Sequence, residues 1–298
     1  MVDSAKRKFY FVFSGFVIVG FVWHLTKVGN GLTTLLRRRE FELQTSPVEH
    51  SLQNDHWTPN TTLIPCKNTD IASDLFLSQD QEDQTLLRWF RNLCGGTYLE
   101  IGALNGKQYS TSHAFHFGLH WKGVLIEASP SSYKGLVVNR PHELATVNKA
   151  VCDKPRQVHF IEKLEAPELG GIWEFADEAF RNTWWSGTTV EAGIAIECVP
   201  LTDILTQHVG EHFFFDFFSL DIEGGEFSVL KTLDFQKFSF GIIFVESSYH
   251  AGTVNEMRNQ ATKSRLESHG YQFLMEFGRS YWFANKDFDK IYQEFVQF

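Results

Sequence analysis

Residues 95–106 read GGTYLEIGALNG, in which an apolar run ends in Glu100 and continues into a loop that carries Gly102 and Gly106. This pattern predicts a buried strand over residues 97–101, followed by a tight loop and a helix. Glycines in such a loop let the backbone turn sharply and approach a ligand that a Cβ atom would exclude. The spacing is neither the Gly-x-Gly-x-x-Gly of nicotinamide enzymes nor a phosphate-binding loop with Lys-Ser/Thr. The stretch therefore predicts a different kind of ligand loop, or, as the alternative, an ordinary strand–helix turn.

Short apolar runs alternate with helical patterns along the rest of the chain. Strands are predicted at residues 97–101, 123–126, 145–147, 194–199, 213–220, 240–245, 271–275 and 280–284. Helices are predicted before residue 95 and at residues 112–118, 131–138, 201–207, 227–233 and 255–269. This rhythm predicts an α/β fold whose seven-stranded sheet is mostly parallel, with helices on both faces and an antiparallel pair at one edge. Residues 154–193 break the rhythm and look inserted.

The strand predicted at residues 123–126 ends at Glu127, 25 residues after Gly102. Ligands of open α/β sheets bind at the carboxyl ends of the strands, where a carboxylate can accept hydrogen bonds from a ribose diol. A solvated glutamate at a strand end is the alternative. The glycine loop and Glu127 together indicate a cofactor that contains a nucleoside.

Residues 219–226, SLDIEGGE, place three carboxylates at the exit of a buried strand. Such crowding is electrostatically costly unless the carboxylates bind something. Glu226 is also placed to cap the following helix, where negative charge is favoured. Asp221 and Glu223 are candidate catalytic groups, and Glu246, at the end of the next strand, joins them. The cluster predicts a general base with a raised pKa, or a site for a divalent cation.

From about residue 78 to residue 284, the chain resembles the FkbM-type methyltransferases, in particular their eukaryotic, membrane-anchored branch. The motifs that carry this resemblance follow in chain order. They are Ser78-Gln79 with Glu82-Asp83, residues 96–106, residues 121–130 with Asn139-Arg140, residues 148–151 and residues 220–226. The last of them, LDIEGGE, is similar to the family's most specific signature, Asp-[Val/Ile]-Glu-Gly-x-Glu.

The resemblance implies a Rossmann-like class I fold and O-methylation by S-adenosyl-L-methionine. Sugars, glycans and other small hydroxylated molecules are the implied acceptors. The implied cofactor-binding residues are Glu100, Gly102, Ala103, Asn105, Gly106, Glu127, Asn148 and Ala150. Of these, Glu100, Gly102 and Gly106 would line the methionine end. Glu127 would hold the ribose, and Asn148 would lie near the adenine.

Methyl transfer to a hydroxyl needs a group that takes the hydroxyl proton, either a base or a metal-bound oxygen. The catalytic candidates are Asp221 first, then Glu223 and Glu246. His113 and His116 are further candidates, although a lone histidine is more often a hydrogen-bonded structural residue.

The inserted segment carries Trp184-Trp185, which is either an aromatic surface for a sugar or part of the core. The leading alternative to an enzyme is a non-catalytic, Star-like protein that uses the same fold in the trafficking of secretory cargo. The enzyme is favoured by the presence of all the expected cofactor and catalytic residues: Glu100, Gly102, Gly106, Glu127 and Asp221.

Residues 9–25 form an apolar stretch without Asp, Glu, Lys or Arg, and Lys6-Arg7-Lys8 precede it. A helix of about this length can cross a bilayer, and the basic residues place its N-terminal end in the cytosol. We predict a cytosolic tail over residues 1–8, a transmembrane anchor over 9–25, a stem over 26–75 and a methyltransferase domain over 76–298. A cleaved signal peptide is the alternative.

Two further features fit a catalytic domain in the lumen of the endoplasmic reticulum or Golgi. Asn60-Thr61-Thr62 is an N-glycosylation sequon. All four cysteines follow the apolar stretch, where they permit two disulfides or remain as buried thiols; they are Cys66, Cys94, Cys152 and Cys198. We therefore predict a single-pass type II membrane protein. The formal charge of −9 argues against general nucleic-acid binding.

Overall fold

The computed structural model describes residues 12–13, 16–17, 63–67, 70–247, 253–293 and 295. The chain separates into two compact units, Met1–Asn54 and Asp55–Phe298. In the first, the short strands β1 (Val12–Phe13) and β2 (Phe16–Val17) pair antiparallel. The whole predicted cytosolic tail and the rest of the predicted transmembrane segment lie outside the described residues, as does most of the predicted stem. Within the described residues, no helix is both long and apolar enough to cross a membrane.

The second unit is built on a mixed sheet that has seven strands within the described residues. Their order is β14 (Tyr271–Phe277), β15 (Ser280–Asn285), β13 (Phe238–Glu246), β12 (Phe213–Leu220), β5 (Thr97–Ile101), β6 (Lys122–Ile126) and β7 (Ala145–Val147). The five strands from β13 to β7 are parallel, and β15 and β14 add an antiparallel edge. The predicted fold class, a mostly parallel sheet with an antiparallel edge pair, is confirmed.

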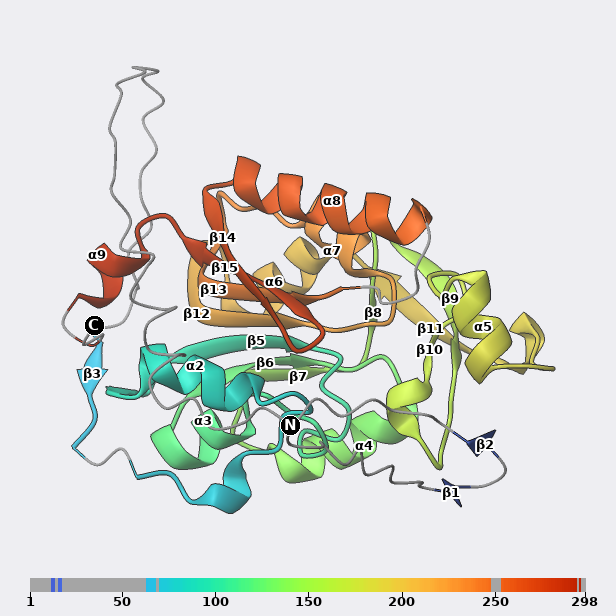
Figure 1. The fold of residues 1–298 in the computed structure, drawn as a ribbon, viewed down its shortest axis with the longest axis horizontal. Helices are drawn as coiled ribbons and strands as arrows, with labels where there is room; N and C mark the ends of the chain where they lie inside the picture. The colour runs from blue at the N-terminus through green and yellow to red at the C-terminus, as the bar shows by residue number, and fades with distance from the viewer. Residues whose placement is uncertain are drawn as a thin grey trace, which may run out of the picture. The chain divides into compact units, whose positions relative to one another are not determined.

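Helices cover both faces of this sheet (Figure 1). On one face lie α6 (Leu201–Val209), α7 (Glu226–Thr232) and α8 (Thr253–Ser268); on the other lie α2 (Glu82–Phe90), α3 (His113–Leu119), α4 (Pro130–Asn139) and α9 (Phe288–Tyr292). The first group buries Leu205, Leu230 and Leu266 against the strands. The second group buries Phe90 and Phe115. The strands between them are almost wholly apolar because water reaches neither face of the sheet.

The predicted insertion forms a second sheet beside the carboxyl ends of the main strands. Its order is β10 (Gly171–Ile172), β9 (Arg156–Ile161), β11 (Ile194–Val199) and β8 (Ala150–Val151), with α5 (Glu178–Trp184) after it. The strand predicted at residues 194–199 therefore exists, but it pairs with β9 and β8 in this second sheet. Periodicity alone does not show which sheet a strand joins. The strands β8, β9 and β10 were not predicted.

The structure pairs the four cysteines as Cys66–Cys94 and Cys152–Cys198, with Cα–Cα distances of 5.1 and 5.8 Å. The first disulfide joins β3 (Ile64–Pro65) to β4 (Leu93–Cys94), which also pair as strands. The second joins the chain after β8 to β11 within the second sheet. The cysteines are therefore disulfides, one of the two states that their number and position allow. Three short 3-10 helices complete the described elements, η1 (Ser73–Leu75), η2 (Pro167–Leu169) and η3 (Val190–Ala192).

Candidate active site

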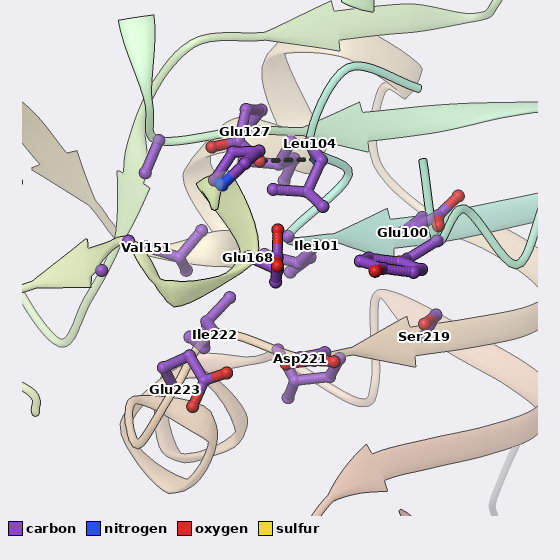
Figure 2. Close-up of a pocket in the computed structure, with 18 of the residues that line it drawn as sticks. Glu100, Ile101, Leu104, Glu127, Val151, Glu168, Ser219, Asp221, Ile222 and Glu223 are labelled. Carbon is purple, nitrogen blue, oxygen red and sulfur yellow. Dashed lines mark hydrogen bonds between the residues drawn. The ribbon is translucent and has the colours of Figure 1, made fainter. Parts of the chain in front are cut away.

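A cleft opens at the carboxyl ends of β5, β6 and β12, where the chain order of the parallel strands reverses. Residues that follow these strands form two walls, and the second sheet and the loop around η2 form a third. The space between the walls is about 1210 Å³, part of it open to solvent. In Figure 2, Glu127 and Leu104 lie along one wall, while Asp221, Ile222 and Glu223 lie along the opposite one.

Gly102 lines this cleft on the loop after β5 and lies close to the backbone at the end of β12. Its φ is +86°, and a Cβ atom there would be 1.9 Å from the carbonyl oxygen of Asp221. The backbone amide of Gly102 donates to the Ile126 carbonyl at 3.0 Å, and the Asp221 amide donates to the Ile101 carbonyl at 3.2 Å. The loop is thus fixed between the exits of β6 and β12, and only glycine fits this position.

Gly106 has a different reason to be glycine. Its φ is +73°, and a Cβ atom would lie 2.6 Å from both the Leu136 Cδ1 atom of α4 and the Cγ atom of Arg140, which follows that helix. It is not among the residues that line the cleft, and neither are Ala103 and Asn105. The Gly106 and Asn105 carbonyls accept from the Arg140 and Asn139 side chains, and Ala103 is buried.

Glu127 lies where a ribose would be held, and its side chain is 3% exposed. One carboxylate oxygen accepts from the Leu104 amide and the other from the Ser129 amide, both at 2.7 Å. Burial raises the pKa of Glu127 to about 7. Each carboxylate oxygen keeps a second acceptor site, so the group can still bind hydroxyl donors.

Of two other predicted cofactor residues, one lines the cleft and the other does not. Ala150 lines the cleft. Asn148 is exposed and does not line it; its side-chain amide donates to the Glu127 carbonyl at 2.8 Å and to the Ala128 carbonyl at 3.2 Å. The structure thus places Asn148 as a brace for the backbone that carries Glu127.

Glu100 is buried at the end of β5 and lines the cleft. Its carboxylate accepts from the Thr111 amide at 2.9 Å, from the Ser110 hydroxyl at 3.1 Å and from the Ser112 hydroxyl. Burial raises the pKa of Glu100, and these donors oppose that effect. The carboxylate is therefore held in one orientation.

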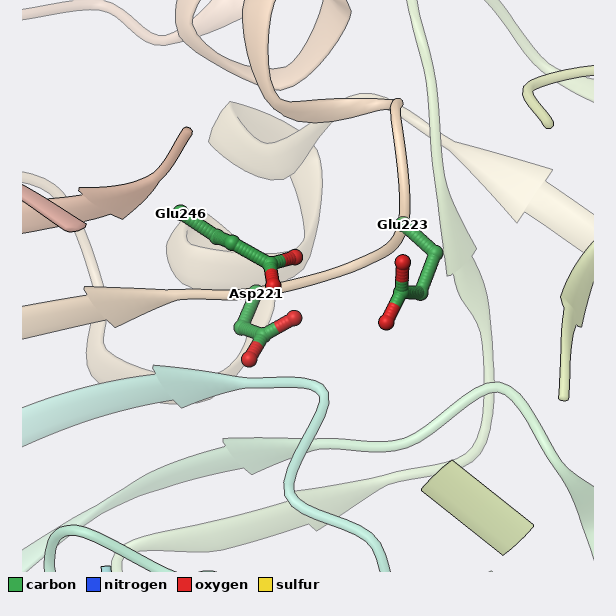
Figure 3. A group of neighbouring side chains, drawn as sticks. All are labelled: Asp221, Glu223 and Glu246. Carbon is green, nitrogen blue, oxygen red and sulfur yellow. The ribbon is translucent and has the colours of Figure 1, made fainter. Parts of the chain in front are cut away.

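The three catalytic candidates come together, as the sequence predicted. Carboxylate oxygens of Asp221, Glu223 and Glu246 lie within 4.8 Å of one another (Figure 3). Asp221 and Glu223 line the cleft, whereas Glu246 lies next to Asp221 and is nearly buried. Burial, and then the charges of Asp221 and Glu226, raise the pKa of Glu223 to about 8. Burial also raises the pKa of Glu246 well above its usual value, with a further contribution from Asp221.

Arg279, which the sequence reasoning missed, completes this cluster from the turn between β14 and β15. Its guanidinium donates to a Glu246 oxygen at 2.6 Å and lies 3.8 Å from an Asp221 oxygen. It also donates to Asp80 at 3.1 Å and to Gln79. Ser280 pairs with Glu246 across the antiparallel strands β15 and β13. The predicted turn at Gly278 therefore indicated that Arg279 lies near Glu246.

Glu226 and the two candidate histidines serve the fold. Glu226 accepts from the Ile222 and Gly224 amides at 3.1 and 3.0 Å, within the loop that leads into α7. The His113 ring bonds to the Leu75 carbonyl at 3.0 Å, and His116 bonds to Glu143 at 2.9 Å. Neither histidine lines the cleft. Glu226 therefore fits the role of a helix cap, and the two histidines fit that of hydrogen-bonded structural residues.

The second sheet forms the third wall of the cleft, which was not predicted from the sequence. Phe160 and the residues around η2, including Glu168, face the cleft. Glu168 accepts from the Gln108 side chain at 3.1 Å, which joins this wall to the glycine loop. Trp185 is buried and donates to the Leu169 carbonyl at 2.8 Å, so it supports the wall as part of the core. Trp184 is exposed.

The methyltransferase FkbM domain matches residues 100–273 of the chain, which include most of the residues that line the cleft. The chain belongs to the FkbM methyltransferase family. The protein is therefore an S-adenosylmethionine-dependent methyltransferase, as the sequence predicted. Among solved structures, it is similar to the precorrin-6y C5,15-methyltransferase of Geobacter metallireducens GS-15, with 13% sequence identity and a TM-score of 0.34. That match covers 74% of this chain and 95% of the other. None of the curated proteins matches the chain.

The cleft of this FkbM methyltransferase fits the cofactor that its family uses. S-Adenosylmethionine carries a ribose diol, an adenine ring and a cationic amino-acid end. Glu127 offers carboxylate acceptors for the diol, and Glu100 offers a buried negative charge. Apolar residues that also line the cleft, including Ile126, Val151 and Phe160, suit a flat base. Gly102 gives the close backbone approach that a Cβ atom would block.

Proposed function

We propose that this methyltransferase methylates a hydroxyl of a sugar, a glycan or another small hydroxylated acceptor. The observation that carries the proposal is the carboxylate group in which Asp221 and Glu223 lie on the wall opposite Glu127 and Glu246 lies next to them. Carboxylates accept hydrogen bonds from hydroxyls, and one with a raised pKa can remove a proton near neutral pH. The cofactor, when bound, supplies an activated methyl group.

Within this cluster, we favour Glu223 as the base, although the sequence ranked Asp221 first. Glu223 lines the cleft and has a pKa of about 8, close to the value that suits a base near neutral pH. Asp221 is 45% exposed and lies beside Arg279, which suits an acceptor for a second hydroxyl of the substrate. Glu246 is bonded to Arg279 and nearly buried, so its charge acts mainly on its neighbours.

A divalent cation held by the same three carboxylates is the alternative way to lower the pKa of the acceptor hydroxyl. The two versions differ in one measurement. A general base keeps its activity in the presence of a chelator, whereas a metal-dependent reaction loses it and regains it when the cation is restored.

We further propose that the domain works in the lumen of the endoplasmic reticulum or Golgi, behind an N-terminal membrane anchor at residues 9–25. The apolar stretch with its basic N-terminal flank supports the anchor. The pairs Cys66–Cys94 and Cys152–Cys198 support an oxidising compartment, because disulfides rarely persist in the cytosol.

The acceptor class is tested with the full-length protein in detergent micelles. S-Adenosylmethionine carrying a labelled methyl group is offered with neutral sugars and oligosaccharides, and S-adenosylhomocysteine release is followed. We expect label in a product that resists mild base, because a methyl ether is stable where a methyl ester is hydrolysed. A base-labile product would show carboxyl methylation and contradict the proposal. An Asp221→Asn/Glu223→Gln double variant serves as the inactive control.

A further inference from the structure

Arg140 follows α4 and is buried behind the cofactor loop, where its side chain is 1% exposed. A buried guanidinium is costly unless all its donors are used. All five N–H groups have acceptors here. Glu143 accepts at 2.8 Å, the Gly106 carbonyl at 3.0 Å, Ser110 at 3.2 Å, Tyr98 at 2.6 Å and Ser112 at 2.8 Å.

Three of these acceptors belong to the segment between Gly106 and α3. The preceding residue, Asn139, adds a fourth contact, since its side-chain amide donates to the Asn105 carbonyl at 2.8 Å. Gly106 has no room for a Cβ atom because the Arg140 stem occupies that space. The end of α4 therefore holds the cofactor loop on the side away from the cleft.

The serines extend this contact into the cleft. The Ser110 and Ser112 hydroxyls accept from Arg140 and donate to the Glu100 carboxylate. Each hydroxyl has one proton, so accepting from the guanidinium directs that proton to Glu100. Arg140 thus sets the direction of both hydrogen bonds and the orientation of a carboxylate that lines the cleft.

We propose that Arg140 is a positioning residue for methyl transfer, which acts through Ser110 and Ser112 to hold Glu100 against the ammonium group at the amino-acid end of the cofactor. The proposal rests on the cofactor site described above. Glu127 and Glu100 lie at the ends of neighbouring strands, so a ligand whose ribose binds Glu127 can reach Glu100 with its amino-acid end. A buried carboxylate attracts an ammonium group strongly because little water screens the pair.

Two ligands separate this role from simple support of the loop. S-Adenosylhomocysteine has the amino-acid end, and 5′-methylthioadenosine lacks it. Calorimetric titration of the full-length protein measures both affinities. We expect the Ser110→Ala/Ser112→Ala variant to bind S-adenosylhomocysteine about tenfold or more weakly, with methylthioadenosine affinity changed less than about twofold.

Arg140→Lys is a second variant that keeps the buried positive charge. Its single ammonium group has three donors on a flexible stem and does not reproduce the fixed fork that binds both serines. The same selective loss is expected. The matched control is Ser239→Ala, because the buried Ser239 hydroxyl has no hydrogen-bond partner within the described residues. It should bind both ligands like the wild type.

Equal losses for both ligands would mean that Arg140 only supports the loop, and unchanged affinities would mean that the serines do not act on Glu100. Either result overturns the proposal. Failure of the wild-type protein to bind either ligand would instead overturn the cofactor site, and this proposal with it.

Discussion

Glu127 combines deep burial with a proposed role in ribose binding that needs its negative charge. Ribose hydroxyls donate to the ionised carboxylate, so cofactor binding favours the deprotonated form. Because the pKa of the free group is about 7, affinity should rise as the pH increases from about 6 to 8 and level off above. Binding below pH 7 should release a proton, which calorimetry in buffers of different ionisation enthalpy measures.

Glu127→Gln is the variant that tests this dependence. It should weaken cofactor binding by about 1.5–3 kcal/mol, because a charged acceptor is lost. It should also remove the pH dependence between 6 and 8. Methylthioadenosine should lose affinity as well, since it keeps the ribose. A pH profile identical to that of the wild type would assign the dependence to another group.

Glu223 should control turnover rather than cofactor affinity. A general base is worth about 10²–10⁴-fold in rate, so Glu223→Gln should lower kcat by that order while the cofactor Kd stays within about twofold. The wild-type rate should rise as the pH increases through about 8, because the base works only when ionised. Glu211→Gln, at an exposed ion pair with Lys237, is the control. A near wild-type rate for Glu223→Gln would leave Asp221 as the base to test.

At this scale, the sequence could predict residues that lie next to a strand end in the chain. Glu127, Asp221 and Glu246 each close a predicted strand, and parallel strands bring their carboxyl ends together. It did not assign Arg140 its five partners, and it missed Arg279, which reaches the carboxylates from the turn between β14 and β15 at the edge of the sheet. Their roles depend on the register of elements distant in the chain, and residue type and local spacing carry no information about that.

The contact between the glycine loop and the end of β12 is the feature that organises the site at the level of elements. Gly102→Ala would force a Cβ atom against the Asp221 carbonyl, in a residue whose amide is bonded to Ile101 in the adjacent strand. We expect a loss of about 2–5 kcal/mol of unfolding free energy, from overpacking plus the strain of a positive φ. Cofactor binding should be lost with it. Chemical denaturation and calorimetry measure the two effects.

Gly187→Ala is a matched control for that substitution. Gly187 also has a positive φ, of +76°, but a Cβ atom there would meet no atom within 4 Å. The variant should lose only the backbone term, about 1–2 kcal/mol, and keep its cofactor affinity. Similar behaviour of the two alanine variants would show that the φ angle matters at Gly102 and that the contact with Asp221 does not.

The strands of the main sheet were predicted to within two residues at each end, because most of them are apolar and bounded by glycine or polar residues. The second sheet was not, since β8 and β10 have two residues each and β9 mixes polar and apolar side chains. A short strand forms because of its contacts with neighbouring strands, and its own hydrophobic pattern is too short to predict it. The wall of the cleft near Glu168 was missed for this reason.

The molecule as a whole is a cofactor-binding sheet to which a disulfide-linked second sheet adds one wall of the cleft. The Cys152–Cys198 disulfide closes a loop that contains that wall, and Cys66–Cys94 ties the chain before α2 to the strand after it. Each disulfide should contribute about 2–4 kcal/mol by restricting the unfolded chain. A fold with two such links is suited to an oxidising compartment.

This arrangement leads to a prediction about where the domain lies in a cell. In sealed microsomes the domain should resist added protease until detergent is present, and a maleimide should label the cysteines only after reduction. Asn60 lies in the sequon, so Asn60→Gln should remove a glycan detected as a glycosidase-sensitive mass shift. Asn68→Gln, at an asparagine outside any sequon, should leave the shift in place. Digestion of the domain from the cytosolic side, with cysteines that react without reduction, would contradict both the topology and the disulfides on which it rests.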